Sequence, residues 1–205
     1  FKDGLREGEG KLTHKNGDIY FGAWVKDRRQ GQGSFTTPDG SKYEGAWVAV
    51  KMEGTGSITY PDGSVYAGTF AGGLADGSGK ITYADGSTYD GQWTAGVING
   101  KGIATYANGL VYEGDFVNGK NEGMGRMTYA DGYTYDGQWS GGQRNGTGTA
   151  TYADGTVATV DQMAKDIAAF LVGVYIYNKD KPKEGSMFGG GPPAAMANNA
   201  TPPTS

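Results

Sequence analysis

The chain repeats itself every 23 residues, and this repeat restricts its possible folds more than any other feature. Each unit begins with Tyr, has Gly two residues later and a large aromatic residue two residues after that. The Tyr and aromatic pairs are, in order, Tyr20 and Trp24, Tyr43 and Trp47, Tyr66 and Phe70, Tyr89 and Trp93, Tyr112 and Phe116, and Tyr135 and Trp139. Side chains two residues apart point to the same side of a β-strand. The first part of each unit therefore predicts a strand with its rings on one face.

The second part of each unit predicts a second strand. A Gly-x-Gly pair follows the large aromatic residue, and apolar residues then alternate with Thr as far as an Asp-Gly or Asn-Gly turn. A further ring column on the apolar side contains Tyr60, Tyr83, Tyr106, Tyr129 and Tyr152. Asp-Gly and Asn-Gly are typical of tight hairpin turns. Each unit is therefore predicted to form one β-hairpin, and the repeated glycines account for most of the 39 Gly in the chain.

The repeat divides the chain into four predicted segments. Residues 1–19 hold the second half of an earlier unit, so we expect further sequence before Phe1, and residues 20–157 hold six full units. Residues 158–178 include an amphipathic stretch that predicts a short helix and then a strand, which cap the last repeat or dock a partner. Residues 179–205 are rich in Pro, Gly and Ala and predict a flexible tail. One unit is too small to fold alone, so the hairpins must stabilise one another by stacking.

The composition argues against an active site. The chain has no Cys and a single His, His14, which occupies a ring position and is interpreted as a packing residue. Carboxylates on the strand face opposite the rings recur in register with the repeat, at Glu44, Asp90, Glu113, Asp115 and Asp136. An open face lacks the water-excluding pocket that catalysis needs, so we interpret them as a solvated face or as contacts for a basic partner. We therefore predict no enzymatic activity, no cofactor and no metal site.

The charges bear on the kinds of partner. The net charge of −4 argues against nucleic-acid binding. The longest apolar run covers residues 167–177, whereas a membrane-spanning helix needs about 20 residues. Basic residues are concentrated near the start of the chain, where Lys26, Arg28 and Arg29 share one hairpin turn. Those three residues are the candidate contacts for an anionic phospholipid surface.

Taken together, Tyr-x-Gly-x-Trp/Phe, Gly-x-Gly and Asp-Gly-x-x-Tyr at this period resemble the MORN repeat (membrane occupation and recognition nexus). Residues 112–135 are close to the family pattern, including Asn118-Gly119-Lys120 in the hairpin turn. The resemblance implies an all-β fold, an elongated single-layer antiparallel sheet of consecutive hairpins with a ring-lined groove. Members of the family serve as scaffolds and targeting modules through protein contacts or dimerisation, with lipid binding claimed for several. The resemblance thus implies a protein partner and allows a homodimer.

The ring columns supply the predicted partner groove. Its residues are Tyr20, Trp24, Tyr43, Trp47, Tyr66, Phe70, Tyr89, Trp93, Tyr112, Phe116, Tyr135 and Trp139, with Tyr60, Tyr83, Tyr106 and Tyr129 beside them. The first interpretation is that these rings form the core that joins the repeats. Because a single-layer sheet has nothing over its second side, we also expect part of this face to stay accessible and to bind a peptide or helix.

The leading hypothesis is a non-enzymatic scaffold or accessory subunit that binds protein partners or joins a larger assembly. An intracellular location is favoured, either at a membrane surface or within a complex. One alternative is a peripheral membrane adaptor that uses the basic first turn. Another is the targeting arm of an enzyme whose catalytic part lies upstream of Phe1.

Overall fold

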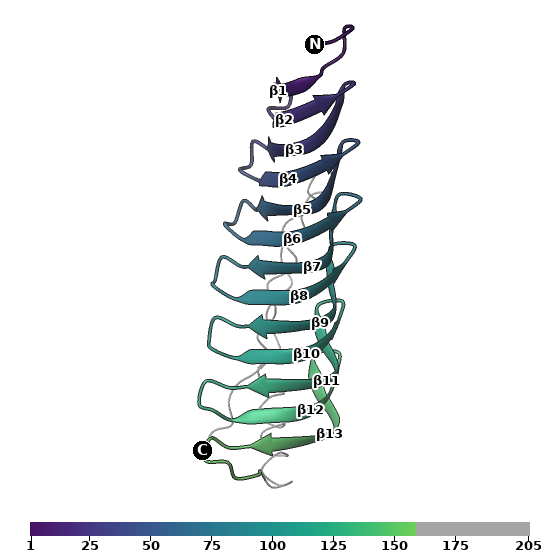
Figure 1. Cartoon of the computed structure of the whole chain (residues 1–205). Helices are drawn as coiled ribbons and strands as arrows, with labels where there is room; N and C mark the ends of the chain where they lie inside the picture. The colour runs from purple at the N-terminus through teal and green to yellow at the C-terminus, as the bar shows by residue number, and fades with distance from the viewer. Residues whose placement is uncertain (159–205) are drawn as a thin grey trace. The chain divides into compact units, whose positions relative to one another are not determined.

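The computed structural model describes residues 1–158 and is all-β. Thirteen antiparallel strands form one open sheet in which the strand order follows the sequence (Figure 1). The strands are β1 (Gly8–Thr13), β2 (Ile19–Val25), β3 (Arg28–Thr36), β4 (Lys42–Val48), β5 (Lys51–Thr59), β6 (Val65–Ala71), β7 (Leu74–Thr82), β8 (Thr88–Thr94), β9 (Val97–Thr105), β10 (Val111–Val117), β11 (Lys120–Thr128), β12 (Thr134–Ser140) and β13 (Gln143–Thr151). The predicted all-β hairpin array is therefore confirmed. The helix predicted within residues 158–178 and the tail from residue 179 lie outside the described residues.

Each full repeat supplies two strands of fixed length. The even-numbered strands have seven residues and carry the Tyr-x-Gly-x-Trp/Phe segment, for example in β4. The odd-numbered strands from β3 onward have nine residues and carry Gly-x-Gly, for example in β5. In the hairpin of β4 and β5, Tyr43 lies opposite Ile58 and Gly45 opposite Gly56, and the register then shifts by a bulge before Trp47. The bulge lies beside a glycine because a side chain would obstruct this close approach of the two strands.

The two ends of each hairpin use different turns. At the Asp-Gly end, the aspartate side chain accepts a hydrogen bond from the backbone N–H two residues later, as between Asp62 and Ser64 at 2.8 Å. At the opposite end, which we call the tip, two consecutive residues have positive φ, such as Ala49 at 47° and Val50 at 83°. Two positive φ values in a two-residue loop are typical of the turn that matches the twist of a hairpin.

The described residues divide into two compact units, each with its own aromatic core. The first unit comprises Phe1–Ala84 and Gln92–Val97, and the second comprises Asp85–Gly91 and the described residues from Ile98 onward. In the first unit Tyr43 contacts Trp47 and Phe70 edge to face, with ring centroids 5.1 and 5.2 Å apart. In the second unit Tyr112 contacts Phe116 and Trp139 in the same way, at 5.1 and 5.2 Å. A tyrosine therefore joins the aromatic residue of its own repeat to that of the next.

Candidate functional site

The tyrosine of each repeat lies across the glycines beside it. The hydroxyl of Tyr43 donates a hydrogen bond to the carbonyl oxygen of Ala46 at 2.8 Å. A Cβ at Gly45 would lie 2.5 Å from that hydroxyl oxygen and 2.6 Å from the Cα of Gly56, which is closer than a Cβ approaches such atoms in proteins. The Tyr43 ring therefore fits only because positions 45 and 56 have no side chain.

The tryptophans tie one repeat to the one before it. The indole N–H of Trp47 donates to the carbonyl oxygen of Gly33 at 3.1 Å, and that of Trp93 donates to Gly79 at 2.9 Å. Trp24 and Trp139 make the equivalent bond to Gly10 and Gly125. Phe70 and Phe116 stand at the same position and have no N–H to donate. The ring columns thus combine packing with hydrogen bonding between repeats.

All sixteen residues of the predicted groove are buried. The most exposed of them, Tyr60, has 8% of its surface accessible, and Tyr20, Tyr43, Tyr89 and Tyr112 have none. The accessible ring surface that we expected on this face is therefore not found at these side chains. Burial also raises the pKa of Tyr20 and Tyr43 to about 12, because the charged phenolate loses its hydration. These residues form the core, and their use as a partner groove stays a prediction.

Arginine side chains contact this core, which was not predicted from the sequence. The Arg29 guanidinium lies over the Trp47 ring at 4.6 Å from its centroid and is 7% exposed as a residue. Arg6 lies over Trp24 at 4.1 Å, and Arg144 lies over Tyr135 at 4.6 Å and donates a hydrogen bond to the hydroxyl of Tyr129. All three occupy the same position of the 23-residue repeat, so a search by repeat position could have grouped them. Such cation–π contacts extend the ring core by one further column.

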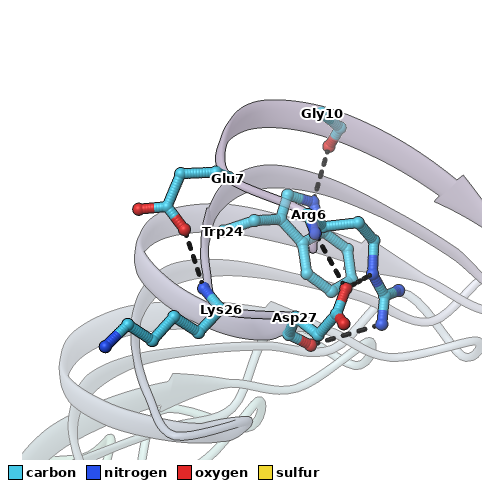
Figure 2. A network of polar contacts seen from close by, with 6 residues as sticks. All are labelled: Arg6, Glu7, Gly10, Trp24, Lys26 and Asp27. Atoms are coloured by element: carbon cyan, nitrogen blue, oxygen red, sulfur yellow. Dashed lines mark hydrogen bonds and ion pairs between the residues drawn. The ribbon is translucent and has the colours of Figure 1, made fainter. Parts of the chain in front are cut away.

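The predicted lipid cluster is only partly assembled. Lys26 and Arg28 are exposed, whereas Arg29 is buried in the ring core. Figure 2 shows the Lys26 side chain extending away from the neighbouring ion pair, in which Arg6 Nε donates to Asp27 Oδ1 at 2.8 Å. Hydrogen bonds from Arg6 lower the pKa of Asp27, so this carboxylate stays ionised and paired. Two of the three predicted cations are therefore available at this tip.

A second column that the sequence analysis missed holds the hairpin tips together. A side-chain oxygen accepts a hydrogen bond from the backbone N–H of the first tip residue 19 positions later. The pairs of acceptor and donor are Glu7 and Lys26 at 2.9 Å, Gln30 and Ala49 at 3.2 Å, Glu53 and Gly72 at 2.8 Å, Asp76 and Ala95 at 2.9 Å, Asn99 and Asn118 at 3.4 Å, and Glu122 and Gly141 at 2.8 Å. Figure 2 shows the first of them. Because Glu, Gln, Asp and Asn all serve, what recurs is an acceptor oxygen rather than a residue type or a charge.

The sheet face opposite the rings carries exposed side chains, several of which differ between repeats. In the second unit an open groove of about 580 Å³ is lined by Asp90, Ile103, Glu113, Met124 and Arg126, together with Lys101, Asp136 and four glycines. Three of these side chains take part in two ion pairs, Lys101 with Asp115 at 2.9 Å and Arg126 with Asp136 at 2.6 Å. Four of the five carboxylates predicted for this face thus line the groove or border it. The ion pairs are exposed enough to contribute little to stability.

Residues 1–158 contain no group of three or more His, Cys, Asp and Glu side chains that could hold a metal ion. Among the same residues, no helix is long and apolar enough to cross a membrane.

The geometry defines a class of protein, a repeat protein built of β-hairpins whose rings, glycines and tip acceptors join each hairpin to the next. The family model of the MORN repeat matches at residues 1–19, 20–42, 43–65, 66–88, 89–111, 112–132 and 135–157. The chain therefore belongs to the MORN repeat family, with seven repeats. No curated protein matches the chain.

Several solved structures have a distant likeness to the chain. One is the SAS-4 (dCPAP) TCP domain of Drosophila melanogaster in complex with a proline-rich motif of Ana2, at 16% identity and a TM-score of 0.47, covering 74% of this chain and 82% of that one. Another is the TCP10 domain of Danio rerio CPAP, at 17% identity and a TM-score of 0.31, with 77% and 89% covered. A CPAP G-box domain gives 17% identity and a TM-score of 0.30, with 73% and 84% covered. Likeness at this level says nothing about what this chain binds.

Proposed function

We propose that this chain is a non-enzymatic protein-interaction scaffold. One observation carries the proposal: the repeated rings and glycines join the hairpins, whereas apolar side chains that differ between repeats are exposed on the opposite face. Tyr43 and Trp47 are buried against their neighbours, whereas Val48 in the same strand is 50% exposed. Stacked repeats create the extended surfaces that proteins of this kind use for binding.

The exposed face opposite the rings is the better candidate for the partner surface. Large apolar side chains such as Phe21, Val48 and Met124 are between 50% and 59% exposed there. Exposed apolar side chains among charged ones are typical of sites that bind proteins. The ring groove predicted from the sequence is the competing surface. Because its rings are buried, a partner on that side would have to contact the residues around the rings.

Photo-crosslinking in the full chain tests both surfaces in one experiment. A photoreactive amino acid is placed at Val48 on the exposed face, at Ala75 on the ring side of the sheet, or at Lys15 in an exposed turn as the control. In cells that express the chain, we expect a discrete protein adduct from position 48 and none from position 15. An adduct from position 75 alone would favour the ring groove instead. The absence of protein adducts from all three positions would contradict the scaffold function.

Contact with anionic phospholipid is the alternative function, and the exposed Lys26 and Arg28 are what supports it. Co-sedimentation with anionic and neutral vesicles at low and high salt tests this alternative. Electrostatic binding requires pelleting with anionic vesicles only, and this pelleting must decrease as salt is added. Protein that stays in the supernatant throughout would rule out this use of the first tip.

A further inference from the structure

A stripe of apolar and basic side chains follows the hairpin tips of the first unit. It lies on the sheet face opposite the rings, and we call it the tip stripe. Three cross-strand pairs form it, Val25 with Arg28, Val48 with Lys51, and Ala71 with Leu74. Val25, Val48 and Leu74 are 44%, 50% and 38% exposed, and Arg28, Lys51 and Ala71 are also exposed. Each of the three repeats thus contributes one apolar residue from an even-numbered strand, at the same position of the 23-residue repeat.

The charge of the tip stripe is positive. Arg28 and Lys51 form no ion pair with any described residue, and none of the six stripe positions is acidic. The nearby carboxylates have other partners: Asp27 pairs with Arg6, and Glu7, Glu53 and Asp76 accept backbone N–H groups of the following tips. A complementary partner therefore carries acidic side chains next to apolar ones.

The spacing of the stripe selects the partner's backbone conformation. Successive repeats are two strands apart, which is about 9.6 Å at about 4.8 Å per strand. Seven residues of an α-helix rise about 10.5 Å and return to the same side of the helix. An extended peptide covers a similar length in three residues, but its first and fourth side chains point to opposite sides. The stripe therefore matches a helix with apolar residues seven apart, and sheet twist limits the contact to two or three repeats.

We infer that the tip stripe docks an acidic amphipathic helix of a protein partner, with apolar residues at i, i+7 and i+14 against Val25, Val48 and the Ala71–Leu74 pair. Glutamate or aspartate beside those residues pairs with Arg28 and Lys51. This inference rests on the proposed scaffold function and names the class of partner. It concerns a surface that does not use the buried rings.

The test is a binding titration of the full chain with a designed helical probe. The probe is a fluorescent three-heptad peptide with one Leu per heptad, each flanked by Glu, in a background of Ala and Gln. The control peptide has the same composition, with the Leu residues distributed around the helix. We expect saturable binding of the probe in a 1:1 ratio and binding of the control that is about tenfold weaker or more.

Two double variants examine the two halves of the stripe. Val25→Ser with Val48→Ser removes the apolar contacts, and Arg28→Glu with Lys51→Glu reverses the charges. Each is expected to weaken probe binding by about tenfold or more. Lys11→Glu with Lys80→Glu changes the net charge equally on the same face away from the stripe, and it should leave binding unchanged. Circular dichroism checks that each variant is folded.

Four outcomes would overturn the inference. The first is equal binding of probe and control peptides, and the second is an equal effect of the Lys11 and Lys80 variant. The third is that the chain binds anionic vesicles but not the probe, and that Arg28→Glu with Lys51→Glu abolishes the vesicle binding. This result would assign the stripe to lipid. A failed probe titration together with a protein adduct from position 48 would reject the acidic helix and leave the scaffold function standing.

Discussion

A single residue, Val50, stands in a backbone conformation that does not suit it. Its φ is +83°, where the four tips that follow along the chain have Gly at the same position. A β-branched residue in the left-handed region is strained by roughly 1–3 kcal/mol. Glycine relieves that strain but costs up to about 1 kcal/mol of unfolded-state entropy. We therefore predict that Val50→Gly raises the free energy of unfolding by about 1 kcal/mol, as measured by urea denaturation followed by tryptophan fluorescence.

The matched control for this prediction is Val48→Gly. Val48 lies in an extended strand, where Gly is less favourable than other residues by roughly 0.5–1 kcal/mol, so this variant should be less stable. A Val50→Gly protein that is also destabilised would show that the tip backbone is not strained.

The arginines that contact the ring core could not be recognised from the sequence. The rings of the core could be predicted because Tyr and Trp recur every 23 residues and alternate with polar positions. Arg29 was instead grouped with Lys26 and Arg28 as a candidate lipid contact, because the three basic residues share one hairpin turn. Its neighbour Trp47 provides a ring face that accepts the guanidinium and lets it be buried. That ring comes from the next repeat, so the contact becomes visible only when the strands are paired.

At the scale of the hairpin, the tip acceptors fix how one hairpin lies on the next. Glu53 accepts the backbone N–H of Gly72, and the equivalent acceptor for Ala49 is the neutral Gln30. We predict that Glu53→Ala lowers the free energy of unfolding by about 1 kcal/mol and speeds amide exchange at Gly72, because the donor loses its partner. Glu53→Gln keeps an acceptor oxygen and should resemble the unmodified chain. If Glu53→Gln is destabilised as much as Glu53→Ala, the charge of Glu53 matters and the hydrogen bond does not.

The hairpins themselves could be predicted from the local sequence, but the contacts between neighbouring hairpins could not. Asp-Gly and Asn-Gly turns and the alternation of rings with Thr predict where strands end and which face is apolar. The tip acceptors were missed because four residue types share one role at that position. Accessible ring surface was expected because a single-layer sheet has nothing over its second side. In the structure, Tyr43 is closed in by Trp47, Phe70 and the glycines on which it lies.

At the scale of the whole molecule, the buried tyrosines predict alkaline unfolding. Burial raises the pKa of Tyr20, Tyr43, Tyr60 and Tyr106 from 10.0 to about 12. Between these values the unfolded chain loses phenolic protons that the folded chain retains, so the free energy of unfolding falls as pH rises. The tyrosine contribution to stability is fully present below pH 10 and is lost between about pH 10 and pH 12.

Tyrosinate absorbance and tryptophan fluorescence, recorded together during an alkaline titration, measure this effect. We predict that the tyrosines ionise in the same step in which the fold is lost. Tyrosines that ionise near pH 10 while the fold persists would show that the ring columns are open to solvent.

The measurement that tests the central claim most directly is the comparison of crosslinks from Val48 and Ala75 in the full chain. The claim is that the repeated rings hold the sheet together and that the varied, exposed face binds the protein partner. It predicts a discrete protein adduct from position 48 that exceeds any adduct from position 75. A discrete adduct from position 75 with none from position 48 would contradict the claim and return the partner to the ring groove.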